Sequence, residues 1–354
     1  MALKYDVAIV GAGPAGSIFA RELSIAKPNL KILLVDAQKS EKRKVCGGLL
    51  APDAQKMLSK LGLTLPKDVL SDPQIFDVET IDITKKQIRH YQRHYLNMDR
   101  YSFDRWLVSL IPQRVEKFSG RCVNIVKNDD GFLVTLKRKE NEEKIVASFI
   151  VGADGANSLV RRLFFKSNPK KYISIQQHFV CETASLPPYS CIFDTETSDS
   201  CSWTIRKEDH FIYGGAFERK GCRTAFEKQK SRLESFIGIS FGETIKTEAC
   251  LLTSPRHFRD FQIGKKNIFL IGEAAGFISA SSFEGISSAM LSGKLLAEAF
   301  VRSKKLSDIA RIYKRTSFWI KLKLYLKIQK RKVLCSPFLR FLIMKSGIQS
   351  VKKY

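Results

Sequence analysis

The stretch that decides the fold is residues 4–16, which read KYDVAIVGAGPAG. Its first half is a short apolar run typical of a buried strand, and its second half is rich in glycine. A helical pattern follows to about residue 26, and a second apolar run, 31–35, ends at Asp36. The order strand, glycine turn, helix and strand predicts a β-α-β unit over residues 4–36.

The glycine spacing in this turn is that of dinucleotide-binding proteins. Gly11, Gly13 and Gly16, with Ala15 between the last two, allow a tight turn and close approach of a pyrophosphate to a helix N-terminus. Asp36 lies 20 residues after Gly16, where an acid accepts hydrogen bonds from the ribose hydroxyls of an adenosine. The alternative is a glycine-rich turn in an unrelated α/β protein, but strand, turn, helix and acid agree on a dinucleotide.

Two later segments indicate which dinucleotide is bound. Residues 152–161, GADGANSLVR, resemble the DG motif of the flavin hydroxylase superfamily, and residues 271–276, IGEAAG, resemble its GD motif. The resemblance implies that Asp154, Gly272 and Glu273 contact FAD, although Glu273 stands where aspartate is usual. The alternative for both acids is an ordinary turn or helix-cap role.

Residues 283–286, FEGI, open the last long helix of the core. In this superfamily such a helix points its N-terminus at the flavin, so Gly285 and Ile286 are expected to offer free backbone N–H groups to the ring. A simple helix start at Ser282 is the structural alternative, and the two are compatible.

A narrower resemblance comes from residues 44–48, KVCGG, and from Asp99-Arg100 followed by 103–107, FDRWL. With the two motifs above, these segments are similar to the geranylgeranyl reductase family of FAD proteins, from residue 5 to about 345. Within it, residues 46–55 and 269–282 are similar to a subgroup of enterobacterial flavoproteins associated with colicin resistance.

The resemblance implies a fold of the α/β class. A Rossmann-type FAD-binding domain of the flavin hydroxylase type would be discontinuous, formed by residues 1–70, 95–170 and 255–300. An antiparallel sheet carrying the substrate cavity would comprise 71–94 and 171–254, with 301–354 as a basic helical C-terminal segment. Arg100 would be a cationic contact to the cofactor.

The family also implies an apolar substrate cavity for an isoprenoid lipid. Its PxxYxWxFP segment corresponds to residues 201–206, CSWTIR, which keep Trp203 but have Cys201 and Arg206 at the Tyr and Pro positions. Trp203 is therefore a candidate substrate contact, and the alternative is a core aromatic residue on a strand.

Saturating an isolated prenyl double bond requires a hydride on one carbon and a proton on the other. The family places Cys46, Gly47 and Gly48 beside the flavin, so this turn is the candidate catalytic segment. A free cysteine thiol is mostly protonated at neutral pH, which suits a proton donor. The alternative for Cys46 is a buried, inert thiol.

Two other functions compete with prenyl reduction. A flavin monooxygenase shares the three nucleotide motifs, but residues 46–48 belong to the reductase branch, and the WxWxIP signature of flavin halogenases is missing from the sequence. A flavin-containing protein that binds a polyprenyl lipid without turnover is the second alternative. A second GxGxxG motif is also missing, so NAD(P)H or a ferredoxin-type protein is expected as a transient electron donor.

Composition fits a protein of about two domains that works beside a membrane. The 354 residues carry a net charge of +25, and residues 301–354 hold 16 Lys and Arg against one acid, Asp308. Residues 318–328, FWIKLKLYLKI, mix bulky apolar residues with lysines, as in helices that lie on anionic bilayers. A solvated basic face on a packed helix is the alternative, and nucleic acid is not expected because no recognition module is present.

Other sequence features indicate the cellular compartment in which the protein is expected. No uncharged apolar run reaches the 18–20 residues or so of a membrane span. The eight cysteines form no CxxC pair and follow no export signal, so they are expected to be reduced thiols. The five histidines form no ligand cluster, and no metal is expected. These features predict a cytoplasmic protein, peripheral on the inner membrane face.

Overall fold

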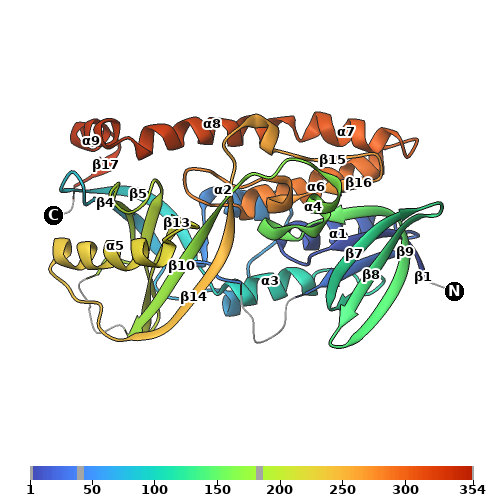
Figure 1. The fold of residues 1–354 in the computed structure, drawn as a ribbon, viewed down its shortest axis with the longest axis horizontal. Helices are drawn as coiled ribbons and strands as arrows, with labels where there is room; N and C mark the ends of the chain where they lie inside the picture. The colour runs from blue at the N-terminus through green and yellow to red at the C-terminus, as the bar shows by residue number, and fades with distance from the viewer. Residues whose placement is uncertain (1–2, 38–43, 181–185, 353–354) are drawn as a thin grey trace.

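The computed structural model describes residues 3–37, 44–180 and 186–352. Two β-sheets lie side by side along the long axis, and a row of helices from the C-terminal end of the chain runs across both (Figure 1). The first sheet contains the predicted β-α-β unit, and the second is built mainly from the middle of the chain.

The first sheet has a parallel centre in the order β6-β2-β1-β9-β16, with β15 antiparallel to β16 and the hairpin β7-β8 continuing from β9. Parallel strands are covered on both faces, which explains the unbroken apolar runs in the sequence. Its strands are β1 (Leu3–Val10), β2 (Ile32–Asp36), β6 (Glu116–Ser119), β7 (Arg121–Asn128), β8 (Gly131–Arg138), β9 (Asn141–Gly152), β15 (Gly264–Lys265) and β16 (Ile268–Leu270).

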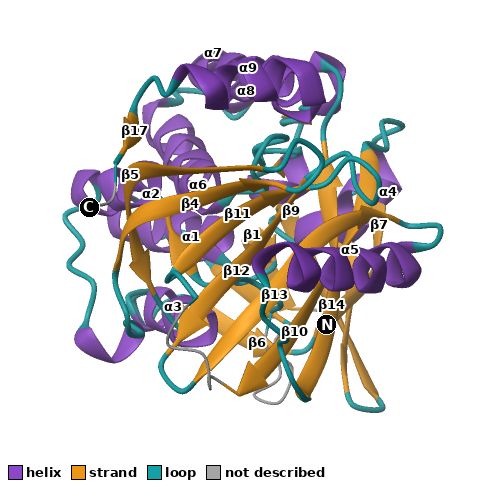
Figure 2. Cartoon of the chain, turned by 90° about the vertical axis from the view of Figure 1, so that its left-hand side faces the viewer, coloured by secondary structure: helices purple, strands orange, loops and turns teal. Residues whose placement is uncertain are grey.

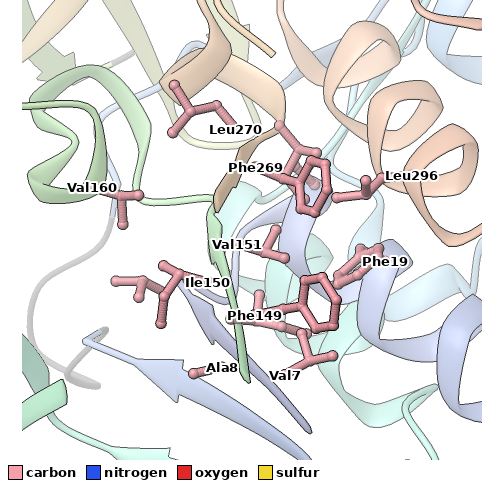
Figure 3. Close-up of a cluster of buried hydrophobic side chains, with 14 of the residues drawn as sticks. Val7, Ala8, Phe19, Phe149, Ile150, Val151, Val160, Phe269, Leu270 and Leu296 are labelled. Carbon is pink, nitrogen blue, oxygen red and sulfur yellow. The ribbon is translucent and has the colours of Figure 1, made fainter. Parts of the chain in front are cut away.

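Two long helices pack together on one face of this sheet, α1 (Pro14–Ala26) and α6 (Ile286–Arg302). The core between them and the sheet is aromatic, with Phe19 of α1 and Phe269 of β16 each in edge contact with Phe300 (Figure 3). Three shorter helices complete this half of the protein: α2 (Pro52–Lys60), α3 (Arg100–Ser109) and α4 (Leu159–Phe164).

The second sheet has the order β14-β10-β13-β12-β11-β4-β5-β17, with the two-residue β3 paired to β5. It was expected to be antiparallel, and it is so except for one parallel pair, β4 with β11. Helix α5 (Cys222–Ile237) covers one face (Figure 2). The strands are β3 (Leu49–Leu50), β4 (Ile75–Asp82), β5 (Gln87–Asn97), β10 (Lys170–Val180), β11 (Tyr189–Phe193), β12 (Cys201–Lys207), β13 (His210–Glu218), β14 (Thr244–Ser254) and β17 (Ser350–Val351).

The C-terminal segment forms three helices, α7 (Asp308–Thr316), α8 (Phe318–Cys335) and α9 (Pro337–Ser346). The helical segment expected over 301–354 is broken at Ser317, whose hydroxyl bonds back to the Tyr313 carbonyl at 2.6 Å. A further break falls at Ser336-Pro337, where Ser336 caps α9. In the part of the chain that is described, no helix is both long and apolar enough to cross a bilayer.

These helices join the two sheets. Ile320, Leu324 and Ile328 on one side of α8 are buried in the core of the first sheet. Beyond α8, the Arg340 guanidinium of α9 donates to the Asp82 carboxylate at the end of β4 over 2.6 Å, and both side chains are fully buried. The predicted fold class, a Rossmann-type domain with a sheet domain and a helical C-terminus, is confirmed.

Candidate functional site

A cavity opens between the two sheets and is lined from both. Of the residues predicted from sequence, ten line it: Gly13, Ala15, Cys46, Gly47, Gly48, Arg100, Trp203, Glu273, Gly285 and Ile286. Five do not: Gly11, Gly16, Asp36, Asp154 and Gly272. The topology therefore brings residues as far apart in the chain as Gly13 and Ile286 to one chamber.

The glycine turn after β1 is a cradle that fits a pyrophosphate. A Cβ on Gly13 would meet no atom within 4 Å, so the backbone there faces open space at the start of α1. No side chain caps this helix N-terminus, which leaves the N–H groups of its first turn for an anion. Gly11, with φ of +110°, and Gly16 instead allow the backbone to pack closely, since a Cβ on either would overlap backbone atoms.

The acid at the end of β2 is held in place by an arginine. The Asp36 carboxylate accepts from the Arg105 guanidinium of α3 over 2.8 Å, and its side chain is 14% exposed. Asp36 thus stands at the carboxyl end of a parallel strand, where such folds bind the ribose of a dinucleotide. Arg105 was not singled out from the sequence, because nothing local connects position 105 to position 36.

Asp154 is placed differently from its expected role. Its carboxylate accepts from the backbone N–H of Leu159 at 2.7 Å and of Val160 at 3.2 Å, and from the Ser158 hydroxyl, so it caps α4. Burial raises its pKa, while these hydrogen bonds act in the opposite direction. Its neighbours Ala153 and Gly155 line the cavity instead, and Asp154 acts by fixing their loop.

Glu273 links the two sheets at the cavity wall. One carboxylate oxygen accepts from the Thr253 backbone N–H of β14 at 2.8 Å, and the other lies 3.8 Å from the Lys44 ammonium. Glutamate in place of aspartate thus reaches across to the second sheet, a contact that its extra methylene permits. The Glu273 side chain also faces the cavity.

The N-terminus of α6 points into the same chamber. Gly285 precedes the helix, no side chain caps it, and both Gly285 and Ile286 line the cavity. Just before them, Phe283 has φ of +53°. A non-glycine residue in the left-handed region is strained, and such strain is typical of functional sites. The helix start offers unpaired N–H groups and a positive dipole end to a bound ring system.

The Cys46-Gly47-Gly48 turn lines the cavity and packs closely against β12 of the second sheet. The Cys46 thiol is partly exposed and accepts a hydrogen bond from the Gly48 N–H at 3.4 Å. The Arg100 guanidinium lies beside this thiol and pairs with Asp104 at 3.0 Å. Burial alone would lower the pKa of Arg100, but Asp104 and Cys46 raise it above its ordinary value, so Arg100 remains a cation.

A buried lysine that the sequence did not indicate forms hydrogen bonds to the Cys46-Gly47-Gly48 turn. The Lys207 ammonium of β12 donates to the Gly48 carbonyl at 3.1 Å, to the Met98 carbonyl at 2.9 Å and to the Asn97 amide oxygen. Burial lowers its pKa to about 8. Lys207 thus ties the second sheet to the Cys46-Gly47-Gly48 turn.

The wall formed by the second sheet combines apolar and neutral polar groups. Trp203 and Ile205 of β12 face the cavity together with Tyr95 of β5 and Gln176 of β10. The Tyr95 hydroxyl donates to the Glu284 carboxylate at 2.8 Å. Within the described residues, no group of three or more His, Cys, Asp or Glu is arranged to hold a metal ion.

The seven cysteines that the structure describes are unpaired thiols, and Cys181 lies outside the described residues. Cys250 contacts the residue that precedes Cys46, since its thiol lies 3.7 Å from the Val45 carbonyl oxygen. Burial raises its pKa to about 12, so its proton is held firmly.

Comparison with known proteins agrees with this geometry. Residues 4–301 match the FAD binding domain family. The chain is 44% identical over 353 residues to the protein CbrA of Shigella flexneri serotype 5b, covering 98% of this chain and 94% of that protein. FAD is therefore the cofactor of this protein.

Solved structures share the fold at low identity. A geranylgeranyl bacteriochlorophyll reductase-like protein from Thermoplasma acidophilum superposes with a TM-score of 0.77 at 17% identity, over 96% of this chain and 91% of that one. PqsL, a probable FAD-dependent monooxygenase from Pseudomonas aeruginosa, gives 0.70 at 16% identity, over 97% of this chain and 100% of that one. Cradle, motif order and full-length identity agree, and the chain belongs to the FAD-binding domain family and, within it, to the CbrA group of flavoproteins.

Proposed function

We propose that this protein is an FAD-dependent reductase of carbon–carbon double bonds in an isoprenoid lipid. The observation that carries the proposal is the position of the Cys46-Gly47-Gly48 turn. One cavity is lined by the nucleotide cradle, by this turn and by the second sheet, and the turn closely approaches Ile205 and Trp203 of that sheet. A proton donor, a cofactor site and a largely apolar substrate wall thus share one chamber.

The chemistry divides between cofactor and protein. When bound, reduced FAD supplies a hydride to one carbon of the double bond. The Cys46 thiol donates its proton to the other carbon, where it stays in the product, and a new proton from solvent then converts the thiolate back to the thiol. Arg100, charged and beside the sulfur, stabilises the thiolate during the step.

Residues around the turn orient the reacting groups. A Cβ on Gly47 would lie 2.5 Å from the Ile205 side chain and 3.7 Å from the Trp203 indole nitrogen, so glycine lets the turn approach the substrate wall. Lys207 fixes Gly48 from the opposite side. These contacts hold the thiol within the chamber and exclude water from the lipid side.

The electrons must be replenished by a second reaction. Each turnover removes two electrons from reduced FAD, and NAD(P)H or a ferredoxin-type protein returns them in the proposal. The family resemblance to geranylgeranyl reductases supports the reductive direction. The shared fold with a probable monooxygenase makes oxygen chemistry the competing outcome.

The experiment is anaerobic flavin reoxidation. The FAD-loaded protein is reduced with dithionite, and geranylgeraniol or a polyprenyl phosphate is added without oxygen. Return of the oxidised flavin spectrum with a saturated product supports the proposal. A flavin that stays reduced until air enters favours a monooxygenase, and lipid binding without any redox change favours a lipid carrier.

We place this reaction at an anionic membrane surface. Large apolar side chains are exposed along α8 and α9, among them Trp319 at 71%, Leu326 at 60% and Phe338 at 64%. Lysines alternate with them, including Lys323 and Lys330 on the exposed side of α8. Apolar residues that enter the headgroup region and cations that meet anionic lipids are the two components of interfacial binding, and they would hold a cytoplasmic protein on the inner face.

A further inference from the structure

The wall formed by the second sheet carries buried polar atoms that the fold does not use. Both carboxamide atoms of Gln176 and the indole nitrogen of Trp203 are buried and find no hydrogen-bond partner among the described residues. Gln176 is 1% exposed, and both residues line the cavity. Buried polar groups are nearly always hydrogen-bonded, so a concentration of exceptions in one cavity needs a reason.

The sheet brings these atoms to one place. Gln176 of β10 and Trp203 of β12 are each paired with Gly214 of the intervening strand β13. A Cβ on Gly214 would lie 2.5 Å from the indole nitrogen and 2.8 Å from Cγ of Gln176. The two side chains therefore converge above Gly214, and glycine is needed there to make room for them.

The neighbouring glutamine shows what a structural role looks like on the same strand. Gln177 points to the opposite face, as strand alternation requires. There its amide donates to Glu227 at 2.9 Å, and its carbonyl accepts from Lys230 at 2.9 Å. Gln176 has the same side chain and comparable burial but faces the cavity, so its hydrogen bonds are left for a molecule that occupies the cavity.

The charges nearby indicate what kind of group completes them. The indole N–H donates, and the carboxamide both donates and accepts, so together they match a neutral oxygen function. Among the described residues, the cations that line the cavity are Arg100 and Lys44, and both are engaged elsewhere, Arg100 with Asp104 and Lys44 near Glu273. A phosphate placed against Gln176 and Trp203 would face a carbonyl oxygen without a compensating charge.

We propose that Gln176 and Trp203 hold an uncharged oxygen function of the substrate, a hydroxyl or a carbonyl. The inference rests on the proposed reduction of an isoprenoid lipid and specifies which kind. Since the indole nitrogen lies 3.7 Å from the Cβ position of Gly47, the oxygen is held near the catalytic turn. The double bond reduced is accordingly the one in the isoprene unit next to the oxygen-bearing end.

Equilibrium dialysis with the oxidised, FAD-loaded protein tests the inference without requiring turnover. The probes are geranylgeraniol, geranylgeranial, geranylgeranyl phosphate and squalene, which carries no oxygen. Gln176→Leu and Trp203→Phe are each expected to weaken binding of the alcohol or the aldehyde about tenfold. The probe whose binding is weakened more, alcohol or aldehyde, identifies the oxygen function as a hydroxyl or a carbonyl. Squalene binding is expected to be unchanged, and Gln177→Leu is the matched control.

The Tm of the ligand-free protein gives a second readout, which is expected to differ between Gln176→Leu and Gln177→Leu. Removing an unpaired buried amide relieves its desolvation penalty, so Gln176→Leu is expected to hold or raise the Tm of the ligand-free protein. Gln177→Leu breaks two made hydrogen bonds and is expected to lower it. A loss of lipid affinity with no loss of Tm separates recognition from packing.

Four results would overturn the inference. One is that Gln176→Leu binds the alcohol and the aldehyde as tightly as wild type does. Another is tighter binding of the phosphate than of the alcohol, which removes the uncharged assignment. A changed flavin spectrum or FAD content in ligand-free Gln176→Leu would mean that the amide faces the cofactor. Failure of the wild type to bind any of the probes would overturn the isoprenoid proposal and this inference with it.

Discussion

Cys46 is the residue on which the proposed chemistry depends, and its replacement has a specific signature. We expect Cys46→Ala to slow lipid-driven flavin reoxidation about a hundredfold, because a positioned general acid contributes at least that much. FAD content is expected to be unchanged, since the thiol does not form the cradle. Stopped-flow absorbance of the anaerobic, reduced protein measures the rate.

Cys250 is the matched control for this change. Its thiol contacts the carbonyl oxygen of the residue before Cys46, but it does not line the cavity. Cys250→Ala should therefore reoxidise at the wild-type rate. An unchanged rate in Cys46→Ala would remove the thiol from the mechanism and leave proton delivery to solvent or another side chain.

At the scale of single residues, the sequence predicted the cavity only in part. Gly13 and Trp203 were placed by motifs, whose spacing encodes a local turn or a strand position. Gln176 and Lys207 gave no signal, because a polar residue in a β-rich run looks like any solvent-facing position. Asp154 was expected at the cofactor, but the helix that starts five residues later takes its carboxylate.

Helix α1 begins at the cradle, and a substitution there separates cofactor binding from folding. Gly13 has φ of −72° and open space where a Cβ would stand. Gly13→Val is therefore expected to fold with a near-wild-type Tm of the FAD-free protein and to retain no FAD, because the valine side chain would occupy the place of the pyrophosphate.

The comparison is with Gly16, where a Cβ would overlap the Gly11 carbonyl oxygen. Gly16→Val is expected to lose the fold itself. Absorbance at 450 nm per chain and thermal unfolding followed by circular dichroism distinguish the two variants. Full flavin content in Gly13→Val would contradict the placement of the cofactor.

The exposed face of α8 and α9 predicts binding to anionic vesicles. We expect wild type to co-sediment with phosphatidylcholine vesicles that contain phosphatidylglycerol, and less so as salt is raised. The double variant Trp319→Ser, Phe338→Ser should bind at least about tenfold more weakly, since each aromatic side chain loses 1.5–3 kcal/mol or so of burial.

Phe76 and Ile245 provide the control for this experiment, because they are exposed to 67% and 57% but belong to strands β4 and β14 of the second sheet rather than to α8 or α9. Changing both to serine should leave vesicle binding unchanged. Equal loss in the two double variants would mean that general surface hydrophobicity, rather than this helix face, is responsible.

The elements were predicted better than their pairing. Local patterns located α1 and the start of α6 to within a few residues, since capping and periodicity are encoded nearby. The parallel pairing of β4 with β11 could not be seen, because it joins strands about 110 residues apart. The break between α7 and α8 was also missed, because Ser317 carries no glycine or proline signal.

At the scale of the whole molecule, the buried ion pair between Arg340 and Asp82 fastens the C-terminal helices to the second sheet. Arg340→Leu leaves the Asp82 carboxylate buried and unpaired, and we expect it to lower the free energy of unfolding by about 3–5 kcal/mol. Urea denaturation followed by fluorescence measures the change.

Arg302→Leu is the matched control, because Arg302 pairs with Glu298 on an exposed surface and is itself 63% exposed. Its expected effect is below about 1 kcal/mol. Similar losses in both variants would show that α9 is not fastened through its buried arginine.

The discontinuous cofactor site has a consequence for how the protein is made. The cradle at residues 11–16 is synthesised first, but the helix start at 285–286 that completes the chamber comes near the end of the chain. Tyr313 and Ile320, which close the core behind it, follow later still. During translation, the nascent chain therefore contains the cradle before the helix start that faces it has been made. We therefore expect FAD to be captured only after these late segments have been made, so that translation products that lack them remain colourless.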